Sequence, residues 1–134
     1  MPKSVAIVAG SYHKDKVKKM VEIVKSLSPD NNLLIEEVCW VPGSMEIPLQ
    51  IKRLLLRESI HGVIVLGIIE KGETDHGLVM GQAVTKSVID LQLLSMKPIG
   101  FGIMGPGAEE EQIDKRVEVH AKQAVLAVAE MLTN

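Results

Sequence analysis

The chain has 134 residues, the size of one domain, and its 46% hydrophobic residues are enough to build a core. Its formal net charge of −2 gives no electrostatic reason to expect nucleic acid or an anionic membrane as a partner. The longest apolar run, residues 63–69, is too short to span a bilayer, so we expect a single domain over residues 1–134.

Hydrophobic periodicity predicts strands and helices in strict alternation. A β-branched run at residues 4–9 predicts a strand, helical spacing follows at 14–27, and turn-forming residues occupy 28–32. Further strand and helix pairs are expected at 33–40 and 45–57, 63–66 and 75–95, and 98–103 and 109–132. Pro48 is compatible with the second helix because it falls near the first turn. Strands separated by helices require right-handed crossovers, which predicts a four-stranded parallel sheet with helices on both faces.

The strand-to-helix junctions of such a sheet are where ligands bind, beyond the carboxyl ends of the strands. The predicted junctions are residues 10–12, 40–44, 67–76 and 102–107. Aromatic residues make up only 2% of the chain, and Tyr12, Trp40 and Phe101 all lie in or beside three of these junctions. One aromatic would most simply close the core at the end of the sheet. Three of them favour a planar ligand at least equally.

Two familiar site patterns are excluded. Residues 100–105 read GFGIMG and match G-x-G-x-x-G, but that dinucleotide fingerprint needs a following helix, a second strand and an acidic residue. Here it lies in the last predicted strand, with one helix after it, so we expect no dinucleotide site. The four histidines do not have the spacing of a zinc site.

The third junction reads GETDH at residues 72–76 and leads into a predicted helix. Backbone N–H groups and a threonine hydroxyl at a helix start can hold an anion, and His76 could exchange protons beside it. Alternatively, Thr74 or Asp75 simply caps the helix, with His76 a solvated first-turn residue. Arg116, in the last helix, suits a phosphate through its planar fork, although a surface ion pair with a neighbouring acid is more common.

The compartment is indicated by the start of the chain and by its cysteine content. The apolar part of residues 1–16 is too short and too soon interrupted for a signal peptide. The single cysteine, Cys39, excludes an internal disulfide, and its simplest role is that of a small buried hydrophobic side chain. We therefore expect a cytoplasmic protein.

Several longer segments resemble the lumazine synthase family. Residues 40–48, WVPGSMEIP, and residues 66–76, LGIIEKGETDH, are similar to two of its signature segments. Residues 104–107, MGPG, with Gln112 and Arg116, are similar to archaeal members, and residues 124–131 resemble the family's terminal helix. The resemblance covers nearly the whole chain. It implies a flavodoxin-like three-layer α/β sandwich, with no metal and no organic cofactor.

The resemblance also implies a reaction and a site. The family condenses 5-amino-6-ribitylaminouracil with 3,4-dihydroxy-2-butanone 4-phosphate, giving 6,7-dimethyl-8-ribityllumazine, phosphate and water. His76 matches the proton-transfer residue. The matching pyrimidine and ribityl contacts are Tyr12 by stacking, Ser44, Met45 and Glu46 on the ribityl chain, Ile68 and Ile69 through backbone, and Phe101 from a neighbouring subunit. The matching phosphate contacts are Gly72, Glu73 and Thr74, with Arg116 from the neighbour.

Two departures from the family pattern concern the site. His13 stands where an asparagine is usual, and residues 77–80, GLVM, follow the histidine where many members read FDYV. A site divided between subunits requires a homo-oligomer, a pentamer or a multiple of pentamers. The short N-terminus leaves little chain for an extra strand on a neighbour's sheet.

Two other functions remain as alternatives. One is an archaeal-type riboflavin synthase, which resembles the same fold and uses two lumazine molecules. The other is a non-catalytic, shell-forming or flavin-binding relative. The intact segments at 40–48 and 66–76 favour lumazine synthase over the first, and the presence of both His76 and Arg116 argues against the second.

Overall fold

The fold is an alternation of strands and helices, as the periodicity predicts. The computed structural model describes residues 1–70, 75–108 and 110–133, with side chains for all of these except 70, 106–108 and 110–114. The elements in chain order are β1 (Lys3–Gly10), α1 (Lys14–Leu27), the short 3-10 helix η1 (Pro29–Asn31), β2 (Leu33–Val41), a second 3-10 helix η2 (Ser44–Glu46), α2 (Ile47–Leu55), β3 (Gly62–Glu70), α3 (His76–Ser95), β4 (Ile99–Ala108) and α4 (Glu110–Thr133).

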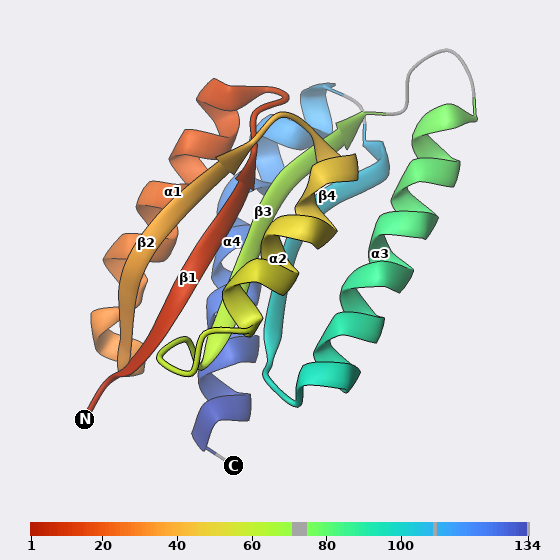
Figure 1. The fold of residues 1–134 in the computed structure, drawn as a ribbon. Helices are drawn as coiled ribbons and strands as arrows, with labels where there is room; N and C mark the ends of the chain where they lie inside the picture. Colours follow the sequence, from red (N-terminus) through yellow and green to blue (C-terminus); the bar gives the residue numbers. More distant parts are fainter. Residues whose placement is uncertain (71–74, 109, 134) are drawn as a thin grey trace.

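The four strands form one parallel sheet in the order β2-β1-β3-β4. Helices α1 and α4 cover one face, and α2 and α3 cover the other (Figure 1). The carboxyl ends of the strands point to the upper end of the view in Figure 1, away from both termini. The predicted three-layer architecture is confirmed. Within the described residues, no helix is both long and apolar enough to cross a membrane.

Each face of the sheet has its own core because successive strand residues point to opposite sides. Ile7 and Ile64 face α1 and α4, while Val8 and Val65 face α2 and α3. Helix α1 is held by a buried stripe at helical spacing, which consists of Val17, Met20, Val21 and Val24. Continuous burial of β1 and β3 is what a sheet covered on both faces requires.

The second helix differs from its prediction over residues 45–57. The chain forms η2 first, and α2 begins only at Ile47 and ends at Leu55. Pro48 stands in the first positions of α2. A proline lacks the backbone N–H but is tolerated in the first turn of a helix, where that N–H has no intrahelical partner, so α2 starts one residue before Pro48.

Strands β3 and β4 are longer than predicted. The expected junction at 67–76 therefore lies partly inside β3, and the one at 102–107 lies wholly inside β4. Glycines and a proline made residues 102–107 look like a turn. β4 is an edge strand, where proline is tolerated, and the β3–β4 pairing is irregular between Ile68 and Glu70. Gly105 has φ +99°, a conformation that favours glycine.

The glycines of the G-x-G-x-x-G match serve packing. A Cβ on Gly100 would lie 2.3 Å from the carbonyl oxygen of Ala124 in α4, and one on Gly102 would lie 2.7 Å from Cδ2 of Leu66. A Cβ on Gly105 would lie 2.1 Å from the carbonyl oxygen of Ile69. The motif therefore sits within β4, and its glycines let α4 and β3 approach closely.

Candidate active site

The sheet has one point where the connections from two neighbouring strands lead away from each other along the sheet. β1 leads through α1 to β2 on one side, while its neighbour β3 leads through α3 to β4 on the other side (Figure 1). In open α/β sheets, ligands bind beyond the carboxyl ends of two such strands. The loops after β1 and β3 are therefore the first place to look for a site.

β3 runs past the end of β1 at this point. The pairing of β1 with β3 ends at Ala9 and Leu66, and β3 continues to Glu70. Ile68 and Ile69 lie in this extension, and their side chains are 2% and 3% exposed. Their side chains belong to the two cores, so a ligand approaching from the β1 side would meet backbone.

The junction after β1 presents Tyr12, whose side chain is 53% exposed. Its ring meets the ring of His13 edge to face, with 4.5 Å between centroids and 71° between planes. The Ser11 N–H donates to the Val41 carbonyl over 2.9 Å, which joins this junction to the end of β2. A half-exposed aromatic ring therefore lies just beyond β1, the strand that neighbours β3.

The junction after β2 contacts the same region. η2 packs against β3 and α3, with Met45 and Glu46 exposed and Ser44 half-buried. The Glu46 N–H donates to the Gly43 carbonyl over 3.2 Å. The predicted ribityl segment is thus a short 3-10 helix next to β3.

One contact at this edge was missed by sequence reasoning. The Lys14 ammonium lies 4.9 Å from the centroid of the Trp40 ring, within cation–π range. The two residues are far apart in sequence, so no local pattern predicts the contact. It fastens the start of α1 to the end of β2.

The junction after β3 leads to His76, the first residue of α3, whose side chain is exposed. Asp75 occupies the N-cap position, but its side chain makes no capping hydrogen bond, and the first turn of α3 contains no acidic residue. The alternative in which Asp75 caps the helix is therefore wrong. Gly72, Glu73 and Thr74 lie outside the described residues.

Arg116 and His76 lie on helices that cover opposite faces of the sheet within one chain. Arg116 is exposed on α4, on the face of the sheet opposite to α3. Arg116 forms no ion pair with any described side chain, and this includes the predicted partner Glu118. The side chain of Asp114, the other predicted partner, is not among those described. One turn later, burial and then the Arg116 guanidinium hold the pKa of His120 below its usual value.

The prediction that Phe101 lies beside a strand-to-helix junction is wrong. It is the third residue of β4, pairs with Val65, and packs half-buried against the core under α2 and α3. β4 continues for several residues beyond it. Only Tyr12 and Trp40 are therefore at the junctions.

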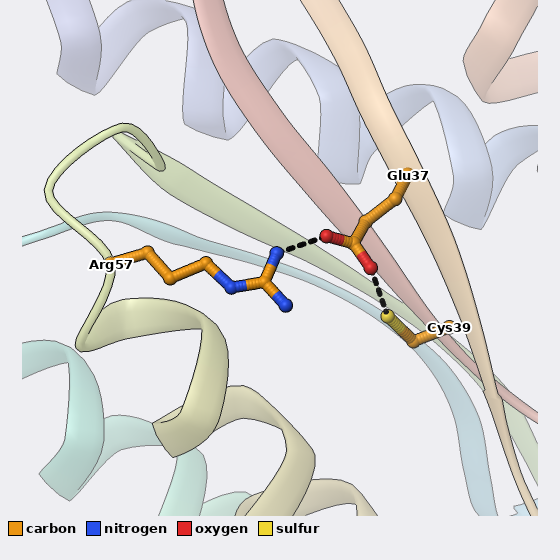
Figure 2. Close-up of polar contacts among 3 residues, drawn as sticks. All are labelled: Glu37, Cys39 and Arg57. Atoms are coloured by element: carbon orange, nitrogen blue, oxygen red, sulfur yellow. Dashed lines mark hydrogen bonds and ion pairs between the residues drawn. The ribbon is translucent and has the colours of Figure 1, made fainter.

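Cys39 is not the buried hydrophobic residue that the sequence predicts. It is half-buried on β2, and its thiol donates to the Glu37 carboxylate over 3.3 Å (Figure 2). Glu37 also forms an ion pair with Arg57. Burial first, and the adjacent carboxylate second, raise the pKa of the Cys39 thiol. The thiol therefore stays protonated, which is the opposite of what a nucleophile needs.

Comparison with known proteins decides the family. The model of the 6,7-dimethyl-8-ribityllumazine synthase family matches residues 2–134. The chain belongs to this family. Among proteins named 6,7-dimethyl-8-ribityllumazine synthase, it is 34% identical to that of Picrophilus torridus over 96% of this chain and 93% of the relative.

Two further relatives agree with this assignment. The chain is 38% identical to the 6,7-dimethyl-8-ribityllumazine synthase of Metallosphaera sedula, over 93% of this chain and 83% of the relative. It is 37% identical to that of Staphylothermus marinus, over 96% and 85%. The predicted resemblance is confirmed, and the chain is an enzyme, a transferase of riboflavin biosynthesis. The family assignment favours lumazine synthase over both alternatives.

Proposed function

We propose that the carboxyl edge around β1 and β3 is where this chain condenses 5-amino-6-ribitylaminouracil with 3,4-dihydroxy-2-butanone 4-phosphate. The reaction is that of its family, with 6,7-dimethyl-8-ribityllumazine, phosphate and water as products. The observation that carries this location is the extension of β3 past the last β1 pair, together with the exposed Tyr12 ring just after β1.

The pyrimidine ring would lie between Tyr12 and the extension of β3. Stacking on the phenol ring supplies a planar apolar face, and the backbone of Ile68 and Ile69 supplies donors and acceptors for the ring edge. The buried side chains of these two isoleucines support a backbone role, because they fix the strand and leave only its main chain toward the ligand. The ribityl hydroxyls would reach Ser44 and the exposed Met45 and Glu46 in η2.

The phosphate would bind at the start of α3. A helix start offers several backbone N–H groups without intrahelical partners, and the helix dipole favours an anion there. The Asp75 side chain makes no capping hydrogen bond to these groups, which supports the assignment. We assign Gly72, Glu73 and Thr74 to the same phosphate. Arg116 of a neighbouring subunit would add the cation that a dianion requires.

His76 would move protons between the two substrates. Schiff-base formation, phosphate elimination and ring closure each transfer protons, and imidazole is the side chain best suited to this near neutral pH. His76 opens α3, so it would stand beside the phosphate. Holding the two substrates together would supply much of the remaining acceleration.

A homo-oligomer, with the pentamer as its minimum unit, would complete the site. Nine large apolar side chains, each about half or more exposed, lie on or next to α2 and α3; this α2–α3 apolar surface consists of Met45, Leu49, Leu56, Leu78, Val79, Ile89, Leu93, Leu94 and Met96. The other helical layer exposes only Val119, Leu126 and Met131 among its described residues.

Such a concentration of apolar side chains exceeds what a monomer usually leaves in water, so a second copy is its natural partner. A groove of about 350 Å³ along α3, lined by residues that include Thr85 and Ile89, could receive a neighbour's side chains. Within one chain, Arg116 lies on the layer opposite to His76, which supports its arrival from a neighbouring subunit. The proposed location of the assembly is the cytoplasm.

The test of this function is turnover of the two substrates by the purified protein. The expected result is formation of the green-fluorescent lumazine and release of one phosphate per product, well above the rate without enzyme. A second reaction with lumazine alone checks for riboflavin synthase activity. Riboflavin formation from lumazine alone, or no acceleration of lumazine formation, would contradict the proposal.

A further inference from the structure

Among the described residues of the proposed site, His13 is the one non-glycine residue with a left-handed backbone conformation. Its φ and ψ are 55° and 46°, and it is the N-cap residue of α1. Its carbonyl accepts the N–H groups of Lys16 and Val17 over 2.9 and 3.1 Å. A side chain in this conformation is unfavourable, although Asn, Asp and His tolerate it better than other residues. Contacts of the imidazole must therefore offset a cost that glycine would avoid.

The imidazole of His13 contacts the ring of Tyr12, the residue before it in the chain. The two centroids are 4.5 Å apart and the planes are inclined by 71°, which is the favourable edge-to-face arrangement. Tyr12 remains 53% exposed, so the contact restrains the phenol ring and still leaves much of it open. An exposed side chain without such a restraint exchanges rotamers rapidly and must be immobilised when a ligand binds.

The residues on either side of this ring pair contact β2. Before it, the Ser11 N–H donates to the Val41 carbonyl over 2.9 Å. After it, the Lys14 ammonium lies 4.9 Å from the Trp40 ring centroid. The imidazole of His13, which contacts the Tyr12 ring between these two anchors, is half-buried and so is itself held in place.

We infer that His13 is a positioning residue, which holds the Tyr12 ring in place to stack on the pyrimidine substrate. The inference rests on the proposed function, in which Tyr12 makes that stack. His13 acts through Tyr12 and needs no contact with the substrate itself. Losing the ring contact should weaken binding of the pyrimidine by about two- to tenfold, the range of an aromatic pair.

The test uses variants that separate the imidazole ring from the backbone conformation. H13G removes the ring and keeps the left-handed backbone. H13N also removes the ring, and asparagine is another residue that tolerates this backbone conformation. H13F keeps an aromatic ring at the position. Calorimetric titration with 5-amino-6-ribitylaminouracil gives the dissociation constant, and steady-state rates give KM for the phosphate substrate. We expect weaker pyrimidine binding in H13G and H13N, tighter binding in H13F than in H13G, and an unchanged KM for the phosphate substrate.

The same titration in a Y12L background distinguishes the two levels of the proposal. If His13 acts through Tyr12, adding H13G to Y12L changes pyrimidine binding by less than about twofold, because coupled residues are not additive. A full additional loss in Y12L, or no loss from H13G or H13N alone, would overturn the positioning role. Unchanged pyrimidine binding in Y12L would instead remove the stacking assignment of the proposed function, whatever the His13 variants show. Far-UV circular dichroism confirms that each variant is folded.

Discussion

Gly100→Ala tests whether the glycine-rich segment of β4 serves packing. The new Cβ would lie 2.3 Å from the Ala124 carbonyl oxygen and 2.8 Å from Cγ2 of Val128. Real Cβ contacts essentially never fall below 3.0 Å, so α4 must move away by about 0.7 Å, the difference between 3.0 and 2.3 Å. The obstructing atom is backbone, so a rotamer change cannot relieve the clash. We expect a loss of about 3 kcal/mol, at the upper end of overpacking effects.

Thermal unfolding followed by circular dichroism measures this loss. At roughly 4 °C per kcal/mol for a chain of this size, the expected decrease in Tm is about 12 °C. Gly67→Ala in β3 is the matched control, because its new Cβ would come no closer than 3.8 Å to Ile103 and Ile47. It should leave stability unchanged or raise it by up to about 1 kcal/mol. All proteins are compared at one protomer concentration, since association shifts Tm.

Two outcomes would refute the packing argument for Gly100. A Tm for Gly100→Ala within about 2 °C of the parent would mean that α4 can yield to a methyl group at little cost. An unchanged Tm with lost activity would give the glycine a role toward a ligand, which the position of Ala124 against it argues against.

Three further substitutions test the site and the assembly. His76→Ala should slow turnover about 100-fold or more, while a substrate analogue still binds. The control His61→Ala, at the amino end of β3, should leave turnover unchanged. Unchanged turnover in His76→Ala would remove its proton-transfer role. Arg116→Ala should raise KM for the phosphate substrate roughly 10- to 100-fold, and an equal rise for the pyrimidine would disprove the phosphate assignment. Leu94→Glu changes a side chain that is 74% exposed on α3, and it should shift sedimentation toward monomers. Leu126→Glu on α4 is the control and should not cause this shift. Equal sedimentation of the two variants would contradict the α2–α3 apolar surface as the interface.

The fold could be predicted from the sequence because its pattern is unambiguous. The β-branched run in β1 and the helical stripe of α1 lie within a residue or so of their predicted bounds. Burial on both faces of a parallel sheet makes its strands uniformly apolar, and the intervening helices leave few other topologies. The ends of β3 and β4 could not be predicted, because Gly102 and Gly105 indicate a turn unless the close approach of Leu66 and Ile69 is known.

The site could be predicted only in part. Position at the carboxyl edge follows from the alternation of strands and helices, and it singled out Tyr12 and His76 correctly as residues after β1 and β3. The contact between Lys14 and Trp40 depends on how two distant segments meet, and no local signal encodes it. The position of Phe101 was predicted wrongly because β4 is longer than the sequence pattern indicates.

The unequal lengths of β1 and β3 connect the packing of this protein to its chemistry. β3 can extend past the end of β1 because β4 accompanies it, pairing Gly67 with Ile103 and Ile68 with Met104. This pairing depends on Gly105, because a Cβ at this position would lie 2.1 Å from the carbonyl oxygen of Ile69. The glycine pattern that resembles a dinucleotide fingerprint thus supports the strand whose backbone we assign to the pyrimidine. The ligand would be held on the neighbouring strand that these glycines keep in place, and not by the glycines themselves.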